Sequence, residues 1–82
     1  MRPTAAHLTL LRALRDGATL KVHRTLDGEK VHRLHPLEGE PVPVDRDLVD
    51  QLVRAGLIVS NMKFPAATYL LTEEGVREAG NG

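Results

Sequence analysis

Residues 46–59 read RDLVDQLVRAGLIV and carry the clearest helix signal in the chain. Asp45 is a good N-cap in front of this run, and Gly56 is a typical helix stop behind it. The apolar residues between them recur at helical spacing, so one face of the helix should be buried; they are Leu48, Val49, Leu52 and Val53. We therefore predict a helix over residues 46–55.

Two short runs of β-forming residues follow this helix, at residues 57–60 and 68–71. Pro65 lies between them and excludes one continuous strand, so the pattern predicts a hairpin with a long tip. Behind the hairpin, Thr72 is placed to cap a short final helix, which Gly75 should weaken.

A helix and a hairpin are expected upstream. Thr4 is a good N-cap for a helix over residues 5–15, which Gly17 ends. Apolar and polar residues then alternate over residues 20–26 and 30–35. The Asp-Gly dipeptide at residues 27–28 separates the two runs, and this combination predicts a β-hairpin.

The register of this first hairpin has two solutions. A two-residue type I′ turn at Asp27 and Gly28 would pair Leu26 with Glu29 and place His23 opposite His32. A three-residue loop with a bulge would shift every pair by one residue.

We expect a second turn over residues 36–41 and a short third strand over residues 42–44. Pro41 and Pro43 confine this strand to the edge of a sheet, because proline cannot donate to the ladder. The element order is α-β-β-(β)-α-β-β-α. It predicts one small α+β domain over residues 1–82, with residues 1–3 and 79–82 frayed.

Composition limits the classes of function. The 82 residues are too few for a multidomain enzyme, and one Phe, one Tyr and no Trp leave an aliphatic core without aromatic platforms for single strands. The chain has no cysteine and no apolar run long enough to span a membrane. Residues 1–8 lack the apolar run of a signal peptide, so we do not expect export by that route. We therefore expect a cytoplasmic binding module that contacts no membrane.

Residues 48–58, LVDQLVRAGLI, and residues 69–75, YLLTEEG, resemble the recognition helix, wing and following helix of bacterial winged-helix regulators. The resemblance covers about a third of the chain. It implies that residues 46–55 form a recognition helix and that the hairpin behind it is the wing. It also implies a left-handed helix cap at Gly56 and a helix cap at Thr72. The sequence departs from the family upstream, where a hairpin replaces the usual second helix.

A weaker likeness links residues 5 to about 72 to small bacterial toxin-like proteins of the YjhX type. It shares the first helix, the glycine turn, the hairpin and the helix end at residues 52–58. It implies no catalytic residue, and it weakens the expectation of ordinary major-groove docking.

Basic residues are the candidate DNA contacts. Residues 1–35 carry seven Lys or Arg against three Asp or Glu, and residues 36–82 carry four against eight. On the predicted recognition helix, Arg46, Gln51 and Arg54 are suited to read bases, although Asp47 and Asp50 oppose phosphates. The remaining candidates lie on the first helix, the first hairpin and the wing: Arg12, Arg15, Lys21, Arg24, Lys30, Arg33 and Lys63. The plainer interpretation is that these side chains only keep the surface soluble.

Catalysis and metal binding are not expected. His23, His32 and His35 lie close in sequence, but His32 and His35 point to opposite faces of a regular strand. No nucleophile elbow, phosphate loop or HExxH motif is present, so we expect neither enzymatic activity nor a cofactor.

The wing tip, residues 61–67, is unusually apolar for a DNA-binding wing. Met62 and Phe64 either fill the small core or form, with Pro65, an exposed patch for a protein partner or a homodimer contact. The leading hypothesis is a non-catalytic regulator or accessory factor that binds double-stranded DNA. The alternative is a protein-interaction module, of the phage or toxin-antitoxin kind, on the same scaffold.

Overall fold

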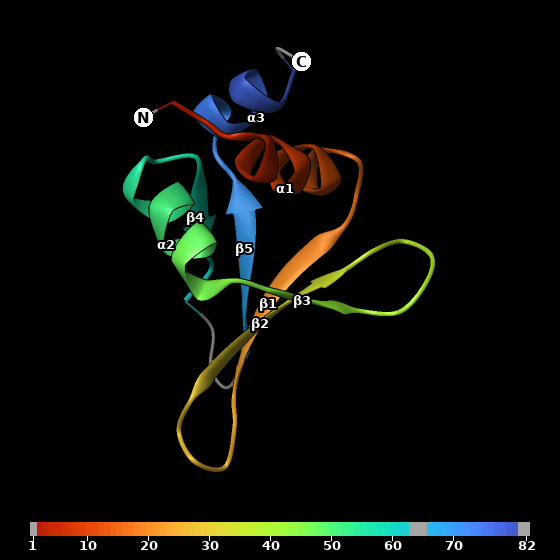
Figure 1. The fold of residues 1–82 in the computed structure, drawn as a ribbon, viewed down its shortest axis with the longest axis vertical. Coiled ribbons are helices and arrows are strands. Elements are labelled where there is room, and N and C mark those ends of the chain that lie inside the picture. Colours follow the sequence, from red (N-terminus) through yellow and green to blue (C-terminus); the bar gives the residue numbers. More distant parts are fainter. Residues whose placement is uncertain (1, 63–65, 81–82) are drawn as a thin grey trace.

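The computed structural model describes residues 2–62 and 66–80. The described chain forms three helices and a five-stranded antiparallel sheet, which confirms the α+β class. The elements run α1 (Ala5–Arg15), β1 (Thr19–Arg24), β2 (Lys30–His35), β3 (Val42–Val44), α2 (Arg46–Arg54), β4 (Ile58–Ser60), β5 (Ala66–Leu71) and α3 (Glu73–Gly80) (Figure 1).

The strands follow the order β3-β2-β1-β5-β4, so both short strands lie at the edges. Pro43 of β3 is therefore accommodated as expected, because one side of this strand needs no ladder partner. β1 is central and pairs with both β2 and β5. Its hairpin with β2 extends away from the helices, and its turn is the part of the chain farthest from α1 and α3 in Figure 1.

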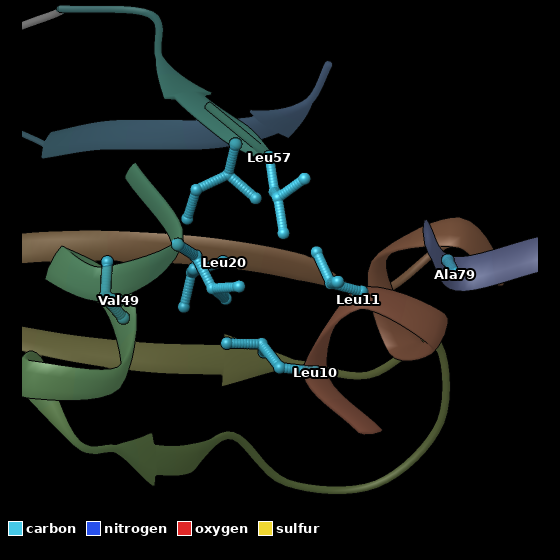
Figure 2. Packing of buried hydrophobic residues seen from close by; sticks show 8 residues of the cluster. Leu10, Leu11, Leu20, Val49, Leu57 and Ala79 are labelled. Carbon is cyan, nitrogen blue, oxygen red and sulfur yellow. The ribbon is translucent and has the colours of Figure 1, made fainter. Parts of the chain in front are cut away.

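The core lies on one face of this sheet. Leu20 of β1, Ile58 of β4, and Leu10 and Leu11 of α1 are buried together with Leu52 of α2. Figure 2 shows residues of this cluster converging from helices and strands. The alternate residues of the strands face the other way, and Arg33, Val59 and Leu70 are exposed there.

The first hairpin adopts the three-residue loop. Arg24 pairs with Lys30, and His23 pairs with Val31, so the two-residue turn is excluded. The Thr25 N–H donates to the Glu29 carbonyl at 2.8 Å, and Gly28 adopts a φ of 85° in the loop between them. This left-handed residue creates the bulge that shifts the register by one.

Both helix boundaries implied by the winged-helix resemblance are present. Gly56 has a φ of 77°, and the Leu57 N–H donates to the Leu52 carbonyl at 3.0 Å, which is a left-handed helix end. The Thr72 hydroxyl accepts from the Gly75 N–H at 3.1 Å and so caps α3.

Two of the residues expected to fray, Ala79 and Gly80, form the end of α3. Ala79 is fully buried, and α3 continues to Gly80. The small Ala79 side chain lets α3 pack closely on α1, which holds the helix end in place. Residues 81–82, and Met1 at the other end, lie outside the described part of the chain.

None of the helices in the described ranges is long and apolar enough to cross a membrane.

Candidate nucleic-acid interface

The β1–β2 hairpin carries two pairs of like charges directly opposite each other. Lys21 faces Arg33, and Arg24 faces Lys30. Like charges at opposed positions of an antiparallel ladder repel and lower stability. The ion pairs found among residues 2–62 and 66–80 are Arg15–Asp16 and Arg77–Glu74, so none of the four hairpin cations forms an ion pair with a carboxylate there.

These two pairs lie on opposite faces of the hairpin. Lys21 and Arg33 share the face that the core leaves open, which they occupy with His23. Arg24 and Lys30 lie on the core face, at the end of the strands beyond the helices. The hairpin is thus a projecting two-stranded ribbon that is basic on both sides.

A cleft of about 730 Å³ separates the end of this ribbon from α2. Lys30 lines it from β2, and Arg46 lines it from the first turn of α2. The register and the helix therefore bring together two candidates that are sixteen residues apart in sequence. Asp50 lies one turn after Arg46 and lines the same cleft with Glu29.

Two rings complete this cleft. The imidazole of His32 and the phenol of Tyr69 have centroids 5.9 Å apart. His32 is only 4 % exposed, and its Nδ1 is buried without a hydrogen-bond partner among the described residues. Burial lowers the pKa of His32, against the opposing attraction of Asp50, and Lys30 and Arg46 lower it further. Burial, together with Asp50, raises the pKa of the Tyr69 hydroxyl.

The lowered pKa of His32 predicts that acid destabilises the fold. The unfolded chain takes up a proton near the ordinary value of 6.5, whereas the folded chain resists it to a lower pH. The contribution of His32 to stability is therefore complete above pH 6.5 and is lost as the pH falls from there towards the folded pKa. Urea unfolding at about pH 7.5 and about pH 5.5 measures this loss.

The difference in the free energy of unfolding between the two pH values should be smaller in His32→Leu than in the wild type. It should be unchanged in the control His23→Gln, since His23 is exposed. An equal loss in the wild type and in His32→Leu would contradict the assignment to His32.

Arg12 and Arg15 of α1 have structural partners. Their guanidinium groups donate to the Ala79 carbonyl at 3.3 Å and 2.9 Å. Arg15 also pairs with Asp16 at 3.1 Å. A cation beside the last carbonyls of a helix satisfies these acceptors and the negative end of the helix dipole. Both residues thus hold α3 against α1 and lie apart from the hairpin candidates.

Gln51 also has a structural partner. The Thr4 N–H donates to His7 Nδ1 at 2.9 Å, so the imidazole proton is on Nε2, which lies 2.7 Å from Gln51 Oε1. The buried His7 ring thereby links the start of α1 to α2. Arg54 is exposed in the last turn of α2, outside the residues that line the cleft.

At the wing tip, Met62 is described and Lys63, Phe64 and Pro65 lie outside the described residues. Met62 is 85 % exposed and has a φ of 59°. The interpretation that Met62 fills the core is therefore wrong, because the backbone turns its side chain outward.

The register of the first hairpin places its three histidines on two different faces of the sheet. His32 faces the core side of the sheet, whereas His23 and His35 share the open side with ring centroids 6.5 Å apart. In the described part of the chain, no three potential ligands come together as a metal site.

No family model, curated protein or solved structure matches this chain. The comparisons therefore assign no role to any residue of the candidate site. Sequence reasoning singled out Lys30 and Arg46 but missed their neighbours Asp50, His32 and Tyr69 as a group. The available signals were the i, i+4 spacing of Arg46 and Asp50 and the i, i+2 spacing of Lys30 and His32.

Proposed function

We propose that this protein is a non-catalytic DNA-binding protein, a small regulator or accessory factor, that grips duplex DNA with its β1–β2 ribbon. The observation that carries the proposal is the two opposed pairs of cations, Lys21 with Arg33 and Arg24 with Lys30. Their repulsion costs stability in the free protein, and phosphates on both sides of the ribbon would relieve it. A two-stranded ribbon fits the major groove, whose walls are lined by phosphates.

In this proposal α2 contributes less to the DNA contact than the ribbon does. The β4–β5 hairpin follows α2 directly, as the winged-helix resemblance implies, and the β2–β3 segment stands before it. However, Asp47 and Asp50 repel phosphates, and Gln51 is bonded to His7. Arg46 lies at the end of α2 that adjoins the ribbon, so it is the helix residue best placed to extend the contact.

Replacing one cation of each pair tests the proposal. We expect Arg24→Gln/Arg33→Gln to make the negative slope of log affinity against log salt shallower by about 1.8, because each lost phosphate contact contributes about 0.9. The same variant should be more stable by about 0.2–1 kcal/mol for each relieved pair. Fluorescence anisotropy on a labelled random-sequence duplex gives the slope, and urea unfolding gives the stability.

The matched control is Arg2→Gln/Arg77→Gln, which changes the net charge equally. Arg2 is exposed, and Arg77 is paired with Glu74 on α3. An equal change of slope in the control would show that only net charge matters, and an unchanged slope in the hairpin variant would remove the ribbon from the interface.

A protein-interaction module is the second candidate function. Val59 and Leu70 face each other on the open side of the sheet, and both are exposed. Met62, which follows β4 in the chain, is exposed as well, and exposed apolar residues are typical of protein interfaces. This candidate takes precedence if duplex DNA does not bind.

A further inference from the structure

The cleft between the ribbon and α2 contains Lys30 and Arg46, which the duplex proposal uses, and also Glu29 and Asp50, which it does not use. Each wall presents one cation and one carboxylate: Lys30 and Glu29 from the hairpin, and Arg46 and Asp50 from α2. No ion pair joins any of these four groups within residues 2–62 and 66–80. Arg46 and Asp50 are one helical turn apart, a spacing that permits a pair, and yet both face the cleft unpaired.

This balance selects the kind of ligand. A simple anion meets two cations and two carboxylates, so it gains little from the cleft as a whole. A ligand that carries an anionic group and a hydrogen-bond donor at separate positions can satisfy both kinds of wall residue. The volume of about 730 Å³ leaves room for a ligand larger than an inorganic ion.

The floor of the cleft favours a planar ring on such a ligand. Tyr69 is partly exposed and lines the cleft, and its ring centroid lies 5.9 Å from that of the buried His32 imidazole. Asp50 lines the same cleft as these two rings.

We propose that this cleft binds a nucleotide whose base carries an exocyclic amine. The base stacks on the partly exposed ring of Tyr69, its amine donates to the Asp50 carboxylate, and its phosphate is held by Lys30 and Arg46. A carboxylate accepts from the N4 amine of cytosine and is opposed by the O4 of uracil. Stacking on aromatic rings supplies the remaining attraction. A free nucleotide and an unpaired nucleotide of a strand present the same chemistry.

Cytidine and uridine monophosphate provide the test, because they share charge and shape and differ at the group that faces Asp50. We expect cytidine monophosphate to bind the wild-type protein at least about tenfold more tightly than uridine monophosphate. Chemical-shift changes during separate titrations give the two affinities. A cytidine-containing trinucleotide, titrated in parallel, shows whether a strand is preferred to the free nucleotide.

Asp50→Asn should abolish or invert this preference, because an amide can donate to O4 as well as accept from N4. Asp47→Asn is the matched control: the change is the same and the helix is the same, but Asp47 does not line the cleft. Lys30→Gln should weaken both nucleotides equally.

The proposal is overturned if the two nucleotides bind equally, if neither binds, or if Asp47→Asn changes the preference as much as Asp50→Asn does. Equal binding of inorganic phosphate or of glycine would also overturn it, because the cleft would then recognise charge without the base. The titration uses no duplex, so its failure is distinct from a failure of the duplex proposal.

Discussion

Gly75→Ala is expected to destabilise the protein by about 2 kcal/mol, although alanine is the better helix former by about 1 kcal/mol. Gly75 lies in α3, where it is buried, and a Cβ at this position would overlap the Leu57 carbonyl oxygen. That oxygen accepts from the Thr72 N–H at 3.1 Å and belongs to backbone that cannot easily move. The glycine that weakens α3 locally is thus required by its close contact with Leu57, in the segment between α2 and β4.

Gly80→Ala is the control for this prediction. Gly80 is in the same helix, and a Cβ there would meet nothing within 4 Å. We expect stability to be unchanged or slightly raised, by up to about 0.5 kcal/mol. Thermal and urea unfolding of both variants give the comparison; a Gly75→Ala protein as stable as Gly80→Ala would refute the close approach.

Leu20→Ala should have the largest effect on stability, a loss of about 2–5 kcal/mol. Leu20 is fully buried in the central strand, opposite Leu34 on one side and Tyr69 on the other. A domain of this size has a total stability of about 4–12 kcal/mol, so the variant should be largely unfolded if the protein lies at the low end.

Leu26→Ala removes the same atoms from the fully exposed hairpin loop. Its stability should stay within about 0.5 kcal/mol of the wild type. Circular dichroism during urea unfolding measures both leucine variants, and a small loss for Leu20→Ala would mean that β1 is not the centre of the core.

Most of the fold was predictable because its signals are local. The helix over residues 46–54, the proline-bearing edge strand and the Thr72 cap each depend on residues within one or two turns. The register of the first hairpin was left with two solutions, because Asp-Gly suits both loop lengths. A type I′ turn would need a positive φ at Asp27 as well as at Gly28, and of the two only Gly28 has one. The close approach of Gly75 to Leu57 depends on tertiary packing, which helix propensity does not contain.

The site was less predictable because it depends on partners far apart in the chain. From the sequence, Arg12 and Arg15 were candidate DNA contacts, because their partner, the Ala79 carbonyl at the end of α3, is more than sixty residues away in the chain. Likewise, Gln51 was a candidate for reading bases, because its hydrogen bond with His7 of α1 joins residues that are 44 positions apart in the chain. The cleft needs the bulged register of the hairpin to bring Lys30 and His32 opposite α2, so periodicity alone could not assemble it.

Binding of the wild-type protein to duplex DNA at two salt concentrations tests the central claim most directly. We predict that a labelled random-sequence duplex binds at about 50 mM salt and that the affinity falls steeply at about 200 mM, as release of counterions from the phosphates requires. A complete absence of binding at the lower salt concentration, with the protein shown to be folded, would contradict the claim.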